Sequence, residues 1–265
     1  MDFTEDQIHR YSRHILLQDI GVEGQEKICN GKVLIVGAGG LGSPIAYYLA
    51  AAGVGTIGII DPDVVDLSNL QRQIIHFTDD LEKSKVLSAK EKIHKLNPEV
   101  NVVTYQTPFA VDNAFEIIQD YDFIVDGTDN FSTKYLINDA CVMARKPFSH
   151  GGILRFHGQT LTHVPGSACY RCLYPEPPGA DAVLSCSQAG VLGAITGVLG
   201  SIQATEVLKY LTGVGTLLTN RLLTFDAREM NFNTLVLKHD THCPACGTNP
   251  SIITLQQIEE ISCKI

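Results

Sequence analysis

The sequence predicts an α/β protein with a Rossmann-like sheet, parallel in the N-terminal half and mixed or antiparallel in the C-terminal half. Three observations support this fold class. Residues 33–36 form a short apolar run, as expected of a strand buried in a parallel sheet, and a glycine-rich turn and a helical pattern follow it. Strand and helix patterns then alternate as far as residue 150. From residue 154 adjacent extended segments replace this alternation.

Composition and charge limit the class of protein. The 265 residues are 45% hydrophobic and 18% charged, which fits one globular unit spanning residues 1–265. A formal net charge of -9, without a concentration of Lys and Arg, argues against nucleic-acid binding. The N-terminus is acidic, and the most apolar later stretch, 191–198, is interrupted by glycines. We therefore expect a cytoplasmic protein that does not enter a membrane.

The first predicted element is a charged N-terminal helix at residues 5–18. Its apolar stripe includes Tyr11, and Gly21 and Gly24 follow as the expected end of the helix. The charged residues, Arg13 among them, are typical of a solvated helix face. The pattern alone therefore assigns this helix no function.

The glycine-rich turn after the first strand is the first functional motif. Gly37, Gly39 and Gly42 fit the pattern G-x-G-x-x-G between that strand and a helix expected at 44–52. Glycine lets the backbone turn sharply and approach a phosphate, and unpaired N–H groups at the start of the next helix face the anion. The motif predicts a nucleotide without deciding between NAD, FAD, S-adenosylmethionine and ATP.

The second strand, 56–60, ends at an acidic residue. Asp61 lies where a Rossmann unit places the carboxylate that binds ribose hydroxyls. If the polar segment after Asp63 forms a helical turn, three side chains share one face, which is also typical of a solvated surface. These three are Asn69, Arg72 and Gln73.

A lysine-rich helical segment follows. Lys83, Lys85, Lys90 and Lys92 lie among Ala and Leu, and we expect most of them to face solvent. The glycine loop contains no Walker lysine, so the β- and γ-phosphates of a triphosphate would need separate cations, for which Arg72 and Lys85 are candidates. Such a glycine motif is most common in dehydrogenases. The polar cluster, however, suits binding of a triphosphate better than it suits hydride transfer.

A third strand, 121–125, ends in the polar segment 126–130. Three predicted strands thus end in polar residues, and their carboxyl ends meet at the edge where doubly wound sheets bind ligands. Asp129 is a candidate Mg²⁺ ligand, because hard cations prefer carboxylate oxygens. As an equally weighted alternative, Asp129 would cap the helix expected at 133–144.

The spacing of the cysteines predicts that the fold also contains a structural zinc site. Cys169 and Cys172 form one C-x-x-C pair and Cys243 and Cys246 form another, and four thiolates close a tetrahedral shell with no open position. A redox role is the alternative, but neither pair follows the strand of a thioredoxin-like unit. Cys186 precedes a long helical pattern and is either a nucleophile of lowered pKa or an inert, packed thiol.

Six motifs occur in one order over residues 10–246. They are Arg10-Tyr11-Ser12-Arg13, Gly37-Ala38-Gly39-Gly40-Leu41-Gly42, Ser68-Asn69-Leu70-Gln71-Arg72-Gln73, Asp126-Gly127-Thr128-Asp129-Asn130, Cys169-Tyr170-Arg171-Cys172 and Cys243-Pro244-Ala245-Cys246. With these motifs the sequence resembles the ThiF/MoeB (HesA/MoeB/ThiF) family of adenylyltransferases, relatives of ubiquitin-activating enzymes. The resemblance covers nearly the whole chain.

The resemblance implies a reaction. Such an enzyme binds MgATP and the C-terminal Gly-Gly tail of a small ubiquitin-like sulfur carrier, whose carboxylate attacks the α-phosphate and expels pyrophosphate. The acyl-adenylate is later converted to a thiocarboxylate. Catalysis of this type depends on charge neutralisation and in-line positioning more than on a general base.

The resemblance also implies roles for the predicted site residues. Asp61 would hold the ribose, Asn69, Arg72 and Lys85 the phosphates, and Asp129 the magnesium. The nucleotide site implied in full is Gly37, Gly39, Gly40, Gly42, Asp61, Asp63, Asn69, Arg72, Gln73, Lys85 and Asp129.

Two further residues and the partners follow from the resemblance. Arg13 would reach the phosphates from the neighbouring subunit of a homodimer, and Cys186 aligns with a cysteine that only some members use. The nucleotide would bind to residues 31–150, and the carrier and zinc to residues 151–250. No rhodanese domain follows Cys246, so we expect sulfur from a separate protein such as a cysteine desulfurase.

Two alternatives and two departures accompany this interpretation. The alternatives are an NAD-dependent oxidoreductase with a structural zinc and a non-catalytic scaffold for a ubiquitin-like protein. The segment His150-Gly151-Gly152 and the Pro-rich segment before Cys186 depart from the commoner versions of the family. Choice of carrier and pathway, whether thiamine, molybdopterin or another, is therefore not predicted.

Overall fold

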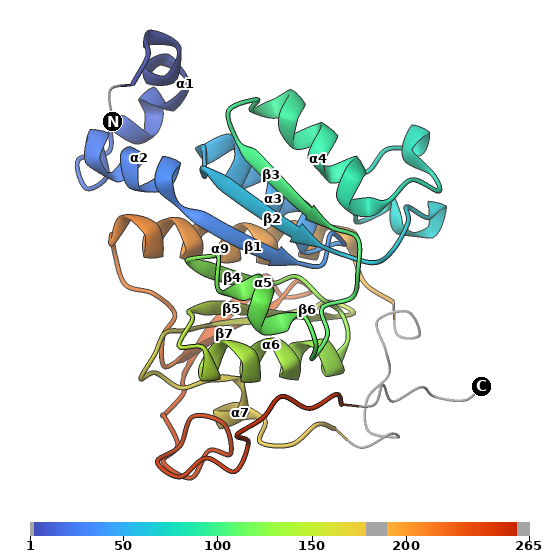
Figure 1. Ribbon diagram of the computed structural model, residues 1–265, viewed down its shortest axis with the longest axis vertical. Coiled ribbons are helices and arrows are strands. Elements are labelled where there is room, and N and C mark those ends of the chain that lie inside the picture. The colour runs from blue at the N-terminus through green and yellow to red at the C-terminus, as the bar shows by residue number, and fades with distance from the viewer. Residues whose placement is uncertain (1–2, 179–189, 259–265) are drawn as a thin grey trace.

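One mixed β-sheet runs through the molecule in the computed structural model, which describes residues 3–178 and 190–258 (Figure 1). Its strands lie in the order β3-β2-β1-β4-β5-β6-β7-β8. The strands are β1 (Lys32–Val36), β2 (Thr56–Ile60), β3 (Asn101–Tyr105), β4 (Phe123–Asp126), β5 (Phe148–Leu154), β6 (His157–His163), β7 (Arg221–Asp226) and β8 (Asn231–Val236). Neighbours from β3 to β5 pair in parallel, and those from β5 to β8 pair antiparallel. The predicted fold class is confirmed.

Helices cover both faces of this sheet. The α-helices of the described chain are α1 (Glu5–Ile15), α2 (Gly21–Asn30), α3 (Gly42–Ala52), α4 (Lys85–Leu96), α5 (Ala114–Ile118), α6 (Phe131–Met143), α7 (Tyr170–Leu173) and α9 (Gly193–Thr212). Apolar residues of α2, α3, α4 and α9 pack on the face that Val33 and Ile35 present. Residues of α5, α6 and α7 pack on the opposite face, with Leu34 and Val36.

This two-sided packing explains the apolar run at residues 33–36. Successive strand residues point to opposite faces, so a strand covered on both faces needs apolar residues throughout. In β1 all four residues of 33–36 are buried. By contrast β8, at the end of the sheet, is exposed along its whole length.

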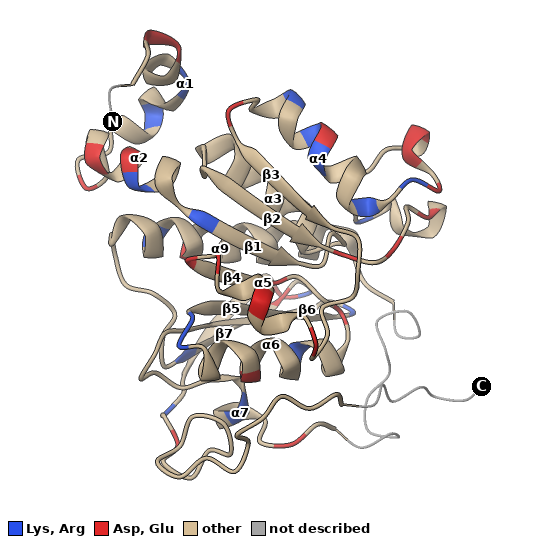
Figure 2. Ribbon diagram, in the orientation of Figure 1, with Lys and Arg blue, Asp and Glu red and all other residues tan. Residues whose placement is uncertain are grey.

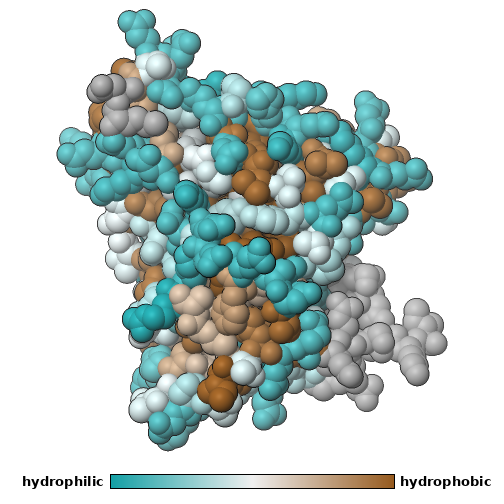
Figure 3. Space-filling view, in the orientation of Figure 1, coloured by the Kyte–Doolittle hydropathy of each residue, from teal (hydrophilic) through white to brown (hydrophobic). Residues whose placement is uncertain are grey.

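The surface mixes charged and apolar residues. Both acidic and basic residues lie along α1, α2 and α4 (Figure 2). In the same orientation apolar residues reach the surface over α6, framed by hydrophilic ones (Figure 3). No helix in the described ranges 3–178 and 190–258 is long and apolar enough to cross a membrane.

The predicted helix at residues 5–18 needs correction. It ends at Ile15, and after a short turn the chain starts a second helix, α2, at Gly21. Gly21 and Gly24 therefore lie in the next helix instead of ending the first. Gly21 has φ +58°, a conformation that glycine adopts without strain, and this lets the chain restart a helix immediately.

Candidate functional site

The predicted phosphate loop lies where the sheet order reverses. β2 and β3 lie on one side of β1, and β4 to β8 lie on the other. The loop 37–42 follows β1, and the segment 127–130 follows β4. Because β1 and β4 are parallel neighbours, both segments leave the sheet at the same edge. In doubly wound folds this switch point is the usual ligand crevice.

Glycines allow these two loops to pack closely. Gly37 has φ +96°, and a Cβ on it would come within 2.9 Å of the carbonyl oxygen of Gly127. A Cβ on Gly42 would overlap the carbonyl oxygen of Gly37. The N–H of Gly127 in turn donates to the carbonyl of Val36, at 2.8 Å. The glycines are thus required by close backbone approach, as the motif predicts.

Asp61 lies beside the glycine loop, at the end of β2. Its carboxylate accepts hydrogen bonds from the backbone N–H of Ala38 (2.7 Å) and of Asp63 (2.9 Å). Burial raises the pKa of Asp61, although the Lys85 charge and the two N–H donors oppose this shift. Each carboxylate oxygen keeps a further lone pair. The arrangement leaves Asp61 able to accept from ribose hydroxyls.

Two lysines of the segment expected to face solvent are buried, which corrects that expectation. Lys85 begins α4, and its Nζ lies 2.8 Å from Oδ2 of Asp63, itself an exposed residue. Lys92 pairs with the buried Asp80. Helix α4 packs on the sheet, so its inward face includes these two residues, and Lys90 remains exposed. Only Lys85 of the two lies beside a predicted site residue.

The three polar residues after Asp63 gather against the glycine loop. Nε2 of Gln73 donates to Oδ1 of Asn69 at 2.9 Å, as the i, i+4 spacing predicts. A Cβ on Gly39 would lie 3.5 Å from Nε2 of Gln73, and one on Gly40 would lie 3.4 Å from Cγ of Arg72. Oε1 of Gln73 is buried and has no hydrogen-bond partner within residues 3–178 and 190–258, which fits a position that a ligand completes.

Asp129 and its neighbours decide between the two roles weighed for this carboxylate. Oδ1 of Asn130 accepts from the N–H of Thr133 at 2.8 Å, so Asn130 caps α6 and the capping role of Asp129 is wrong. Asp129 is exposed and makes no hydrogen bond or ion pair with the described part of the chain. A free carboxylate at the ligand edge fits the hard oxygen donor that Mg²⁺ needs.

Sequence reasoning missed the buried partners of Asp126. Nζ of Lys134 lies 3.0 and 3.2 Å from its two carboxylate oxygens, and Nδ1 of His150 lies 2.9 Å from Oδ2. Burial alone would raise the pKa of Asp126, but the Lys134 charge and the His150 hydrogen bond outweigh burial and lower it. Asp126 is therefore ionised, and both of its carboxylate oxygens already have hydrogen-bond partners. The available signal was Lys134, a lone cation in the apolar pattern of its helix.

A buried histidine, His76, supports the glycine loop and was not among the residues predicted for the site. Nε2 of His76 lies 2.9 Å from the carbonyl oxygen of Ala38, and Nδ1 lies 2.8 Å from Oγ of Ser88. Burial lowers the pKa of His76. A neutral ring can donate to the carbonyl and accept from the hydroxyl. A polar residue between two apolar neighbours, Ile75 and Phe77, was the only sequence signal.

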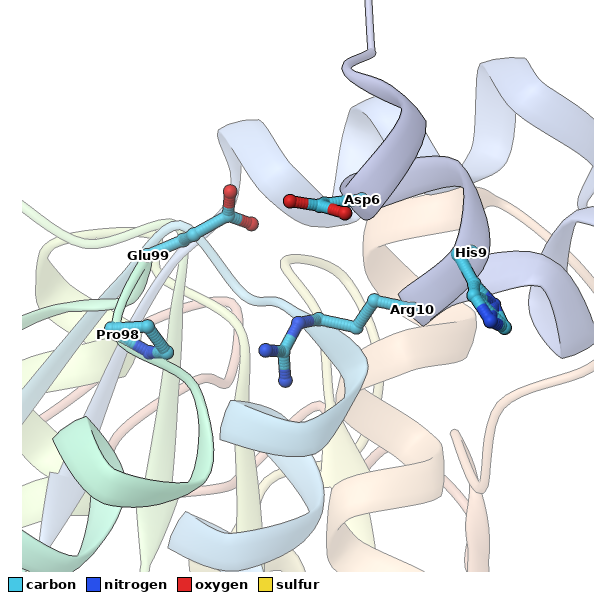
Figure 4. Close-up of a pocket in the computed structure, with 5 residues that line it drawn as sticks. All are labelled: Asp6, His9, Arg10, Pro98 and Glu99. Carbon is cyan, nitrogen blue, oxygen red and sulfur yellow. The ribbon is translucent and has the colours of Figure 1, made fainter.

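Arg13 is not brought to this edge within one chain. Helix α1 packs near the amino end of β3, where Arg10 donates to the carbonyl of Leu96 at 3.0 Å. A hollow of about 540 Å³ lies there between α1 and the loop before β3 (Figure 4). It is lined by Asp6, His9, Arg10, Pro98 and Glu99. Arg13 is exposed, and the arrowheads of β1 and β2 point away from α1 (Figure 1).

The four predicted zinc ligands form one cluster. Their sulfur atoms lie within 4.8 Å of one another, with Cys169 3.6 Å from Cys243 and Cys172 3.4 Å from Cys246. Sulfurs of a tetrahedral zinc site stand about 3.8 Å apart, given a Zn–S bond of about 2.3 Å. The cluster therefore fits a closed zinc shell. Cys186 lies outside the described residues.

This fold and site define a nucleotide-binding α/β protein with a tetrathiolate cluster, and comparison identifies the family. The sequence profile of the ThiF family matches residues 11–245. A sulfur carrier protein adenylyltransferase of Thermus thermophilus is 43% identical over 95% of this chain and 95% of that protein. The chain belongs to the ThiF family, as the resemblance predicted.

Longer relatives and solved structures agree. A probable adenylyltransferase/sulfurtransferase MoeZ of Mycobacterium tuberculosis is 47% identical over 91% of this chain. MOCS3 of Culex quinquefasciatus, an adenylyltransferase and sulfurtransferase, is 46% identical over 97%. This chain spans 63% and 59% of their lengths. A crystal structure of E. coli MccB with ATP matches with a TM-score of 0.76 and 25% identity, over 90% of this chain and 74% of that one.

Proposed function

We propose that this chain is an ATP-dependent adenylyltransferase that activates the C-terminal carboxylate of a small ubiquitin-like sulfur carrier ending in Gly-Gly. The observation that carries the proposal is the meeting of Asp61, the glycine loop, Lys85 and the free Asp129 at one edge of a ThiF-family sheet. The printed names of the relatives support it, because three of them are adenylyltransferases. Neither the oxidoreductase nor the scaffold alternative gains support from them.

The proposed nucleotide contacts follow from chemistry and position. Asp61 would accept the ribose hydroxyls, and N–H groups of loop 37–42 would face the α-phosphate. Asn69, Arg72 and Lys85 would bind the phosphates, with Lys85 already oriented by Asp63 at 2.8 Å. Magnesium held by Asp129 would supply charge neutralisation to the phosphates when bound.

The reaction needs little acid–base chemistry. A carboxylate oxygen of the carrier attacks the α-phosphorus, and the bond from that phosphorus to the oxygen bridging to the β-phosphate breaks. Pyrophosphate leaves with the bonding electrons. The nucleophile is already an anion at neutral pH, so no base has to remove a proton. The residues around the phosphates act by positioning and by stabilising charge.

Several parts of the proposal concern the assembly. Residues 31–150 would form the nucleotide half and residues 151–250 the carrier-binding and zinc half of one adenylation unit. Arg13 would act from the neighbouring subunit of a homodimer, since helix α1, to which it belongs, lies away from this edge of its own sheet (Figure 1). Sulfur would come from a separate protein such as a cysteine desulfurase. Cys186 would contribute a nucleophilic thiol to the reaction. The protein would act in the cytoplasm.

Exchange of labelled pyrophosphate into ATP tests this proposal. We expect exchange only when a carrier ending in Gly-Gly is present. Asp129→Ala is expected to lower the exchange rate by about 100-fold or more, with little change in melting temperature because Asp129 is exposed and has no partner among the described residues. Glu116→Ala, which removes an exposed carboxylate of α5, is the matched control. Exchange without a carrier, or undiminished exchange in Asp129→Ala, would contradict the proposal.

A further inference from the structure

Lys134 joins three backbone segments at a single buried atom. Its Nζ donates to the carbonyl of Thr128 at 2.7 Å and to that of Gly151 at 2.6 Å, besides pairing with Asp126. These acceptors belong to the loop after β4, to β5 and to the end of β4. An ammonium has three N–H donors and no acceptor, so these partners use its full capacity. The side chain is only 7% exposed.

The carboxylate of Asp126 holds the same loop from a second direction. Oδ1 of Asp126 accepts from the N–H of Thr128 at 3.0 Å and from its Oγ1 at 2.7 Å. Nδ1 of His150 forms a hydrogen bond with Oδ2 of Asp126. Because a carboxylate can only accept, Nδ1 carries the proton and donates it to Oδ2. Asp126 is therefore an anchor for the loop and has no free oxygen for a metal ion.

These contacts fix the backbone on both sides of Asp129. Thr128, before it, is held by Asp126 and Lys134. Asn130, after it, is held by the cap on α6 through the N–H of Thr133. The Asp129 side chain between them is exposed and has no partner in the described part of the chain. A fixed backbone with a free carboxylate is how a preorganised metal ligand is built.

We infer that Lys134 is a positioning residue, which places the Asp129 carboxylate for the metal–nucleotide complex by tying the loop 127–130 to β4 and β5. The inference rests on the proposed function for the role of Asp129. Stability alone gives little reason to keep such a pair, because apolar replacements of a buried ion pair are often neutral or stabilising. A positioning role gives the pair a reason to be there.

The test measures metal binding directly. Mn²⁺ is titrated, with electron paramagnetic resonance as readout, into the protein saturated with the non-reactive analogue α,β-methylene-ATP. We expect Lys134→Met to weaken Mn²⁺ binding by about tenfold or more. Lys146→Met is the matched control: Nζ of Lys146 also donates to two backbone carbonyls, of Gln119 (2.8 Å) and Tyr121 (2.7 Å), but at the opposite edge of the sheet. Its Mn²⁺ affinity should stay within about twofold of the parent.

A double-variant comparison separates positioning from general loosening. If Lys134 acts through Asp129, Lys134→Met should change Mn²⁺ affinity by less than about twofold in an Asp129→Ala background, where the phosphates alone bind the ion. An undiminished effect in that background would overturn the inference, as would unchanged Mn²⁺ affinity in the single variant. A parent chain that binds the metal–nucleotide complex but shows no carrier-dependent exchange would instead overturn the proposed function alone.

Thr128→Val decides the question if Lys134→Met does not fold. It removes only the hydroxyl hydrogen bond to Asp126 and retains shape, so folding should survive. We expect a weakening of Mn²⁺ binding by about threefold, in line with the loss of one hydrogen bond. Unchanged Mn²⁺ affinity in a folded Thr128→Val protein would contradict the inference.

Discussion

Removal of zinc is expected to destabilise the fold strongly, because the cysteine cluster joins two distant segments. Residues 173–242, a span of 70 residues, lie between Cys172 and Cys243. Closing a loop of this length in the unfolded chain corresponds to about 4 kcal/mol of stabilisation at 25 °C, by the chain-entropy relation for cross-links. This figure counts chain closure alone, and zinc that binds only the folded cluster stabilises the fold further through its own binding free energy.

Thermal unfolding with and without a chelator measures this effect. For a chain of this size about 4 kcal/mol corresponds to a fall in Tm on the order of 10 °C. Cys246→Ser should give a similar fall without a chelator, and Cys29→Ser, which alters a cysteine outside the cluster, should keep the full chelator response. The reasoning would be refuted by clearly less than one zinc per reduced chain, or by a chelator-induced fall in Tm below about 2 °C.

Two further predictions follow from the loops at the ligand edge. Gly42→Ala places a Cβ on the carbonyl oxygen of Gly37. The affinity for ATP, measured by calorimetry, should therefore fall by about tenfold or more, and the free energy of unfolding by about 1–3 kcal/mol. The control Gly197→Ala adds a Cβ in open space on α9 and should leave ATP binding unchanged. Retained ATP affinity in Gly42→Ala would argue against the close packing of these loops. Asp126→Asn should cost about 3 kcal/mol at pH 7, because it leaves Lys134 buried without its counter-charge. The pKa of Asp126 is lowered on folding, so the stabilisation from its carboxylate is present above the ordinary pKa of 3.8 and is lost as the pH falls toward the folded pKa. In urea unfolding, the difference in free energy of unfolding between Asp126→Asn and the parent should therefore shrink below about pH 4. A difference that does not depend on pH would contradict this account.

Local patterns were sufficient to predict most of the fold. A buried parallel strand needs apolar residues on both faces, and β1 has them. The change from alternating helices and strands to adjacent strands after residue 150 predicted the antiparallel half. The extent of the first helix was wrong, because the conformation of Gly21 depends on how α1 and α2 pack and not on the residue type alone.

The candidate site was predictable where its residues follow strand ends. Asp61, the glycine loop and Asp129 were found because the carboxyl ends of parallel strands meet at one edge. Lys134 and His76 were missed, since each acts through contacts with residues distant in sequence, and a helical or apolar pattern does not show which polar residue points inward. Burial of this kind becomes visible only once the chain is folded.

Transfer of label from ATP to a carrier protein tests the central claim most directly. The chain is incubated with a Gly-Gly-ending carrier and Mg²⁺, once with α-³²P-ATP and once with γ-³²P-ATP, and protein-bound label is measured after rapid gel filtration. Adenylation predicts that the α-label is retained with the carrier and that the γ-label leaves as pyrophosphate. Retention of the γ-label on the carrier, or of neither label, would contradict the account.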